Sequence, residues 1–408
     1  MTPIETVRAQ REKIAGRAQA AESDMVRFLR DLIAIPAESS EEGPVVERVR
    51  REMEKVGFDE VRVDPMGNVL GRIGNGRKIV MMDSHLDTVG VGDRREWAWD
   101  PYKGKVEDGY VYGRGACDQR AGIACLVYAG KIMKELALDG DYTFYAVGSI
   151  MEEDCDGLPW LYILREDKIR ADCVVLTEPT NLRVYRGHRG RMEIEVHLRG
   201  VSCHASAPER GENAVYKMTR LVAAVEKLNE RLRSDPFLGK GTVAVTEIRS
   251  VSPSLCAVPS ACTIHLDRRL TAGDTKESAV AEVKALPGAE EAEIEVLQYD
   301  RPSYTGLVYP MEKYYPTWLL AEDHPLVRAG IGTYQAVFGK PPIVDKWVFS
   351  TNGVGSMGIM GVPTIGFGPG EEDVAHSVGE RVAVSHLVAA TQFYAAFPLV
   401  YLDTVAGS

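Results

Sequence analysis

The chain has 408 residues, with 48 lysine and arginine and 59 aspartate and glutamate side chains, which give a formal net charge of −11. This length can bury a large core, and about two or three domains are expected. No basic block stands out, which argues against nucleic acid as the main partner, because phosphate neutralisation needs clustered basic side chains.

The N-terminal segment and the cysteines bear on location. Residues 1–21 are charged and lack the apolar segment of a signal peptide. No apolar stretch is long enough to span a bilayer. The seven cysteines are scattered, odd in number and without a C-x-x-C pair, which is typical of reduced thiols rather than of a disulfide framework. We therefore expect a cytoplasmic protein with no membrane partner.

Apolar periodicity predicts alternating helices and strands in the first half of the chain. Helices are expected over residues 22–35, 41–57 and 121–136. Strands are expected over residues 61–63, 68–70, 78–86, 142–150 and 174–176. This alternation predicts an α/β fold whose sheet is largely parallel. Several polar residues then follow strand C-termini, which is where open α/β sheets build their sites.

The pattern changes near residue 190. Residues 192–198 alternate apolar and polar, as a half-solvated antiparallel strand does. Helices over 213–232 and 274–286 and strands over 242–248, 262–268 and 291–297 complete an α+β module of about 110 residues. A helix at 325–338, a strand at 363–367 and a helix at 385–397 follow. We predict a first domain made of residues 1–188 and 302–408, interrupted by a second over 189–301.

The end of the strand over 78–86 carries a histidine and an acid. His85 and Asp87 are separated by one residue, so in an extended chain their side chains share a face. A carboxylate beside a ligating histidine fixes its tautomer and raises its basicity; a surface pair is the alternative. Asp118 follows a glycine-rich turn and precedes a helix, where it could bridge two cations or cap the helix.

Further acids and a histidine occur in similar positions. Glu152 and Glu153 end an apolar strand, and burial of adjacent carboxylates needs compensating positive charge. One could ligate a metal while the other accepts a proton from water; a solvated acidic loop is the alternative. Glu178, at a strand end, and His376, in a turn-rich segment, could each be ordinary loop residues when taken singly.

Taken together, these residues indicate a site for two divalent metal ions. Mixed histidine and carboxylate ligation suits Zn²⁺, with Co²⁺ or Mn²⁺ as substitutes. Two metals about 3.5–4 Å apart that share a carboxylate match the template for amide and peptide hydrolysis, in which a metal-activated water attacks a carbonyl.

The same residues carry a resemblance to a known family, the M20 metallopeptidases. The segments that resemble the family's motifs are residues 82–89 (MDSHLDTV), 113–118 (GRGACD), Glu152–Glu153, Glu178 and 375–377 (AHS). They occur in the family's order and span essentially the whole chain. The family includes acetylornithine deacetylase, succinyl-diaminopimelate desuccinylase, carboxypeptidase G2 and aminoacylases. Several segments further resemble its YgeY-type branch.

The resemblance implies a role for each candidate residue. His85 and Glu178 would bind one metal. Glu153 and His376 would bind the other, and Asp118 would bridge the two. Asp87 would orient His85, and Glu152 would be the general base and later the proton donor. The peptide bond between Asp118 and Gln119 would be cis.

The resemblance also implies a zinc-peptidase-like catalytic domain with a mixed, largely parallel sheet, and a ferredoxin-like lid that forms a homodimer. His204, in the segment 200–205 (GVSCHA), would reach the partner subunit's site and stabilise the oxyanion. Arg269 would hold a substrate carboxylate as a fork; a structural salt bridge is the alternative.

Two segments depart from the desuccinylase pattern. They are residues 255–259 (LCAVP) and 349–353 (FSTNG), the second with Ser350 and Thr351 as substrate contacts. Both fall where the family contacts substrate, which argues against succinyl-diaminopimelate. Cys117, Cys155 and Cys203 lie beside key residues, and we interpret them as packing thiols.

The sequence therefore predicts a di-metal amidohydrolase. Its substrate would be an N-acetyl, N-succinyl or N-carbamoyl amino acid or a short peptide. A broad dipeptidase or aminopeptidase with the same metals is a second interpretation. A binding protein without turnover is a third, and the intact Glu152 argues against it, because a pure binder needs no base beside the metals.

Overall fold

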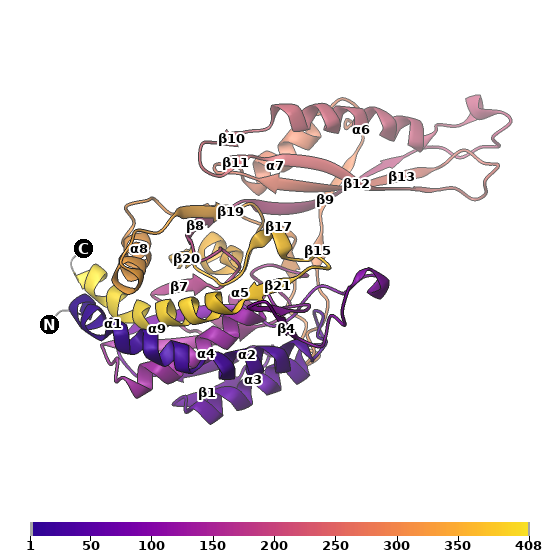
Figure 1. Cartoon of the computed structure of the whole chain (residues 1–408). Coiled ribbons are helices and arrows are strands. Elements are labelled where there is room, and N and C mark those ends of the chain that lie inside the picture. The colour runs from indigo at the N-terminus through magenta and orange to yellow at the C-terminus, as the bar shows by residue number, and fades with distance from the viewer. Residues whose placement is uncertain (1–2, 407–408) are drawn as a thin grey trace.

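The structure, a computed structural model, describes residues 3–406 and has two bodies (Figure 1). The larger body is built from both ends of the chain, and the smaller one from its middle. The smaller body stands off one side of the larger, and the start of α1 (Pro3–Ala20) and the end of α9 (Val384–Ala406) lie near each other on the far side (Figure 1).

Within residues 3–406, a nine-stranded mixed sheet forms the centre of the larger body. Its central strands β6, β3, β7 and β20 are parallel neighbours. The strands β1, β2 and β18 pair antiparallel with their neighbours, whereas β19 pairs parallel with β8. The spatial order is β1 (Glu60–Val63), β2 (Val69–Ile73), β6 (Tyr142–Ser149), β3 (Lys78–His85), β7 (Cys173–Leu176), β20 (Thr364–Gly366), β8 (Val184–His188) and β18 (Trp318–Leu319), with β19 (Val344–Trp347) beside β8.

Helices enclose this sheet. Helix α4 (Arg120–Glu135), buried along nearly its whole length, packs on β3 and β6. Around α4 lie α2 (Glu22–Ile33), α3 (Gly43–Val56) and α9 (Val384–Ala406), while α1 (Pro3–Ala20) packs on α9 (Figure 1). The other helices of this body are α5 (Leu158–Arg165), α8 (Pro325–Phe338), the short turns η1 (Arg94–Glu96) and η4 (Glu372–Val374), and the π-helix η3 (Val354–Ile359).

Short strands complete the larger body and its junction. A three-stranded sheet joins β4 (Lys105–Glu107), β5 (Tyr110–Tyr112) and β21 (Arg381–Ala383). It therefore links the segment before Asp118 to the segment after His376. A two-stranded pair, β15 (Gln298–Tyr299) and β16 (Met311–Glu312), lies where the chain returns from the smaller body.

The smaller body, which we call the lid, is a five-stranded antiparallel sheet with two helices. Its strands are β12 (Thr242–Val251), β13 (Ala261–Leu270), β9 (Gly190–Arg199) and β14 (Glu293–Val296), with β17 (Tyr314–Tyr315) also beside β9. Helices α6 (Ala214–Arg231) and α7 (Lys276–Lys284) cover one face, so β9 and β13 alternate buried and part-exposed residues. The lid also holds η2 (Pro208–Arg210), β10 (Ser234–Asp235) and β11 (Gly239–Lys240).

The smaller body is formed mainly by the segment of the chain that begins at β9. Each body has its own apolar core, and β9 begins at Gly190, close to the predicted start of the insertion. Strand β17 lies after residue 301, where the sequence places the end of the second domain, yet it pairs with β9. The part of the lid sheet next to the larger body, which we call the lid root, therefore includes a strand from the returning chain.

Most predicted elements are observed within a few residues of their expected bounds, and helix 325–338 coincides with α8. Helix α1 was not predicted, because its apolar periodicity is weak; only Val7, Ile14 and Ala18 form its buried stripe. Helix α9 was predicted to end at Phe397 but continues through Pro398 to Ala406. Packing against α1, α4 and α8 outweighs the local cost of that proline.

Two general expectations concern membranes and cysteines. No helix within residues 3–406 is both long and apolar enough to cross a membrane.

The cysteines are free thiols: Cys117 and Cys155 are buried, Cys203 is half-buried and Cys256 is exposed. Burial raises the pKa of the Cys117 and Cys155 thiols, which keeps both in the neutral form suited to packing.

Candidate metal and active site

The candidate ligands meet at one edge of the large sheet. His85 ends β3, Glu152 and Glu153 follow β6, Glu178 follows β7, and His376 follows β20 after the turn η4. These four strands are parallel neighbours, so their carboxyl ends lie at the same edge. Segments far apart in the sequence are thereby brought together at the place that the sequence predicted.

Asp118 lies between the two histidines. Its Oδ1 is 3.0 Å from His85 Nε2, and its Oδ2 is 3.1 Å from His376 Nε2. Glu178 Oε1 is 3.7 Å from His85 Nε2, and Glu153 Oε2 is 3.0 Å from His376 Nε2. Two groups could each hold a metal ion, with ligand atoms within 4.8 Å of one another, and they share Asp118.

The electrostatics of the cluster suit divalent cations. Burial, reinforced by neighbouring carboxylates, raises the pKa of Glu152, Glu153 and Glu178. Hydrogen bonds to Asp118 and Glu153 raise the pKa of His376 to about 10. Several carboxylates thus share a poorly solvated space, and such a concentration of negative charge needs positive charge nearby. The histidine and carboxylate donors fit Zn²⁺ and similar ions.

Asp87 ties the first histidine to the pair of glutamates. Its carboxylate accepts hydrogen bonds from Ser39 Oγ at 2.7 Å and from the backbone N–H groups of Glu152 at 3.2 Å and Glu153 at 3.0 Å. Its Oδ1 also lies 3.4 Å from His85 Nδ1. The same nitrogen lies closer to the backbone oxygen of Asp87, at 3.0 Å, so Asp87 contacts the imidazole through both groups while its carboxylate holds the turn that carries both glutamates.

A residue that sequence reasoning missed, Glu380, holds the loop of Asp118. Its carboxylate accepts hydrogen bonds from the backbone N–H groups of Cys117 at 2.9 Å and Asp118 at 3.1 Å, and from Arg114 at 2.6 Å. The peptide bond between Asp118 and Gln119 is cis, as the family resemblance implied. No local motif marks Glu380, because its role depends on β21 and β5 lying side by side.

A pocket of about 330 Å³ opens over the cluster. The lid contributes Arg191 and Arg269 to its wall, and the larger body contributes Asp156, Phe349 and Ser350 beside the candidate ligands. Ser350 Oγ donates a hydrogen bond to Asp156. Two predicted substrate contacts, Arg269 and Ser350, therefore line the pocket.

Two other predicted contacts are not brought to this pocket. Thr351 is fully buried, and its Oγ1 lies 3.1 Å from Nδ1 of His188, behind the pocket wall. His204 is exposed and lies beyond the distal end of β9, paired with Ala257. Because β9 has ten residues, His204 lies about 30 Å along the sheet from the lid root.

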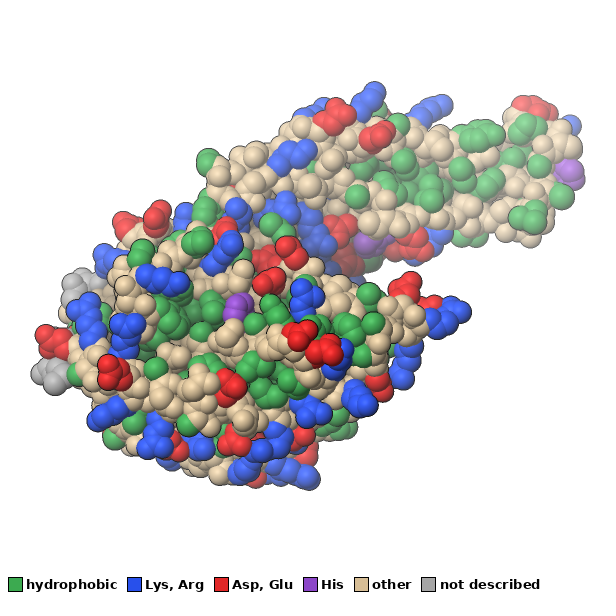
Figure 2. Space-filling view, viewed as in Figure 1, with side chains coloured by type: hydrophobic (Ala, Val, Ile, Leu, Met, Phe, Trp, Pro, Cys, Tyr) green, Lys and Arg blue, Asp and Glu red, His purple; other side chains and the backbone are tan. Residues whose placement is uncertain are grey.

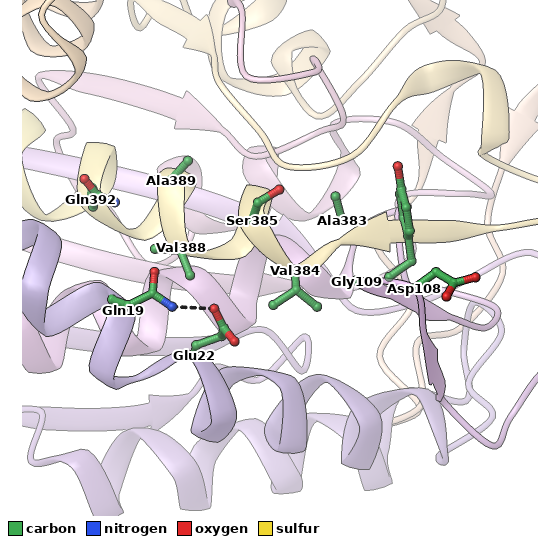
Figure 3. Close-up of a pocket in the computed structure, with 11 residues that line it drawn as sticks. Gln19, Glu22, Asp108, Gly109, Ala383, Val384, Ser385, Val388, Ala389 and Gln392 are labelled. Carbon is green, nitrogen blue, oxygen red and sulfur yellow. Dashed lines mark hydrogen bonds between the residues drawn. The ribbon is translucent and has the colours of Figure 1, made fainter.

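A second hollow, of about 540 Å³, lies on another side of the larger body. Figure 3 shows it between the junction of α1 and α2, the turn before β5 and the start of α9. Glu22 accepts a hydrogen bond from Gln19 there, at 2.6 Å, and Asp108 is the other acid in its wall. Its lining holds none of the clustered histidines and carboxylates, which line the smaller pocket.

Comparison with known proteins gives the family. The sequence model of peptidase family M20/M25/M40 matches residues 81–399. The chain belongs to the M20 family. Escherichia coli K12 YgeY is 53% identical over 393 residues, which cover 96% of this chain and 98% of YgeY. Succinyl-diaminopimelate desuccinylase of Magnetococcus marinus is 28% identical over 91% of this chain and 96% of its own length.

The fold is shared with solved M20 structures. One is Bacillus subtilis YXEP, a dinuclear metal-binding peptidase from the M20 family, with a TM-score of 0.69 at 13% identity over 95% of this chain and 99% of its own. The predicted α/β class and family are therefore confirmed. This M20 protein is a metal-dependent hydrolase.

Proposed function

We propose that this M20 enzyme hydrolyses the amide bond of an N-acyl or N-carbamoyl amino acid or a short peptide, using two divalent metal ions. The observation that carries the proposal is the pair of ligand groups that share Asp118. One group contains His85 and Glu178, and the other contains Glu153 and His376. Zinc suits these donors, with cobalt or manganese as substitutes.

Metal ions bound in this way would polarise the substrate carbonyl and make water a stronger nucleophile at neutral pH. Glu152 lies beside the ligands but in neither group, and its carboxylate is 3.8 Å from His85 Nε2. Burial and nearby carboxylates raise its pKa, which suits a general base. Glu152 would take a proton from the attacking water and deliver it to the leaving nitrogen.

A mixed pool of substrates tests the proposed reaction. We expect the protein to consume N-acetyl, N-succinyl or N-carbamoyl amino acids only when Zn²⁺, Co²⁺ or Mn²⁺ is restored after chelation, because the carboxylate cluster alone cannot polarise a carbonyl. Mass spectrometry of the pool would identify the acyl group. Consumption of dipeptides alone would replace this proposal with the peptidase alternative, and no consumption despite two bound metals per chain would favour a binding protein.

We also propose a homodimer formed through the lid. Strand β12 is an edge of the lid sheet, and Ile248 and Val251 on it are 53% and 63% exposed. Leu255, in the following loop, is fully exposed. Figure 2 shows hydrophobic side chains gathered on the lid. A long edge strand with exposed apolar residues favours pairing with another chain, and pairing there would let His204 approach a second subunit's pocket.

A charge on this edge is expected to separate the subunits. Ile248→Lys should convert a dimer into a monomer in sedimentation velocity, because a buried lysine opposes edge-to-edge pairing. Ile343→Lys is the matched control, since Ile343 is 59% exposed on the larger body and should leave the dimer intact. A wild-type monomer with full turnover would contradict both the dimer and the role of His204 across it.

A further inference from the structure

Two arginines face each other at the lid root. Arg191 on β9 and Arg269 on β13 are directly paired in the antiparallel register, and both line the pocket over the candidate ligands. Like charges directly opposite on neighbouring strands destabilise a sheet unless other charges offset them. The acids around each arginine therefore decide which guanidinium is available to a ligand.

The fork of Arg269 is already occupied. Its Nε and Nη2 donate to Asp267 Oδ1 at 2.7 Å and Oδ2 at 2.9 Å, a bidentate pair within β13. The sequence predicted that this fork would hold the substrate carboxylate, with a structural salt bridge as the alternative. The observed geometry is that of the salt bridge, so Arg269 contributes its charge to the pocket while its fork is engaged.

The fork of Arg191 is unpaired. Its Nε and Nη2 are shielded from solvent and donate a hydrogen bond to no acceptor within residues 3–406. These two atoms form one edge of the guanidinium, with the spacing that matches both oxygens of a carboxylate. Two acids lie nearby, but both distances exceed the usual length of a hydrogen bond. Asp156 Oδ2 is 3.5 Å from Nη2, and Glu193 Oε1 is 3.6 Å from Nη1.

The surroundings hold this guanidinium in place. The ring of Tyr315, on β17, lies 4.5 Å from the centre of the Arg191 guanidinium, and stacking of this kind keeps the planar group oriented. Asp156 is held in turn by Ser350. Arg191 lines the pocket, and its unpaired Nε–Nη2 edge is a preorganised donor pair covered from solvent, a few residues along the chain from where the lid joins the larger body.

We propose that Arg191 is the residue that binds the substrate carboxylate, as a bidentate fork, and that Arg269 adds charge from the opposite strand. The substrates are then amides that carry a free carboxylate. Asp156 is the competing anion of the ligand-free pocket. The inference rests on the proposed function, because it assumes that the substrate enters this pocket, but binding can be measured without turnover.

Binding of matched acids and amides tests the inference. The probes are N-acetyl-L-alanine, N-carbamoyl-L-alanine and L-alanyl-L-alanine, each compared with its C-terminal carboxamide by calorimetry on zinc-loaded full-length Glu152→Gln protein. We expect the affinity of the tightest-binding acid to exceed that of its amide by roughly 10- to 100-fold, which is the contribution of charge-assisted hydrogen bonds. Adding Arg191→Gln should remove that preference, and Arg191→Lys should restore only part of it, because lysine offers no fork.

Two further variants separate binding from structural support. Asp156→Asn should tighten binding of the acid and leave the amide unchanged, because it removes the competing anion. Arg199→Gln, at the distal end of the same strand β9, should change neither the affinity for the acid nor that for the amide. Equal weakening of acid and amide in Arg191→Gln, or no acid binding to the parent protein, would overturn the inference. Acid binding through Arg191 without cleavage of any probe or pool substrate would overturn only the proposed function.

Discussion

Glu152→Gln is expected to lower kcat by roughly 10²- to 10⁴-fold, the usual contribution of a general acid–base residue. Glutamine keeps the size of the side chain but cannot accept the proton from water. Both metal ions should remain bound, because Glu152 belongs to neither of the two ligand groups. Steady-state kinetics on the substrate that the pool identifies, together with metal analysis of the same preparation, would measure both effects.

The position of Glu152 makes this result informative. Its backbone N–H is fixed by Asp87, so the substitution alters the carboxylate and leaves the turn held in place. Loss of a metal ion from a variant that folds as the wild type does would move Glu152 into the ligand set and refute its assignment as base. An unchanged kcat would also refute the assignment of Glu152 as the general base.

Asp118→Asn is expected to have the second large effect, on both metals together. Its two oxygens face different histidines, so removal of the negative charge weakens both ligand groups. Loss of the Lewis acid costs several kcal/mol of transition-state stabilisation, which corresponds to a decrease in kcat/KM of about 10³-fold or more. Metal analysis after gel filtration should give fewer than two ions per chain.

A matched control shows that the effect is specific. Asp373 is an exposed acid three residues from His376, and Asp373→Asn should keep both ions and the wild-type kcat/KM. Circular dichroism should show that both variants are folded. Two ions retained in Asp118→Asn would mean that each group binds its metal without a shared carboxylate.

The sequence predicted most of the features that depend on residues close together in the chain. The apolar runs before His85, Glu152 and Glu178 are strands because they are buried on both faces of a parallel sheet. Polar residues follow these strands, and neighbouring parallel strands have their carboxyl ends at the same edge of the sheet. These two facts were enough to predict that edge as the site. His376 does not directly follow its strand, because the turn η4 lies between β20 and this histidine; the sequence therefore singled it out only in combination with the other candidate residues.

What the sequence did not reveal depends on contacts between distant segments. Glu380 holds the Asp118 loop across 262 positions of the chain, and no local pattern distinguishes it from a loop acid. Arg269 matched a family segment, yet its fork binds Asp267, whereas Arg191 had no motif and has the unpaired fork. Thr351 lies next to Ser350 but turns into the core toward His188, a difference that only packing decides.

The five candidate ligands span residues 85 to 376, so a large part of the larger body must be in place before either metal group exists. Ions that bind only the native chain add to the free energy of unfolding, by about 2.7 kcal/mol for a site at 100 times its Kd. The supply of metal in a cell would then govern how often the chain opens to proteases. Starvation for the ion would shorten the lifetime of the protein as well as stop its chemistry.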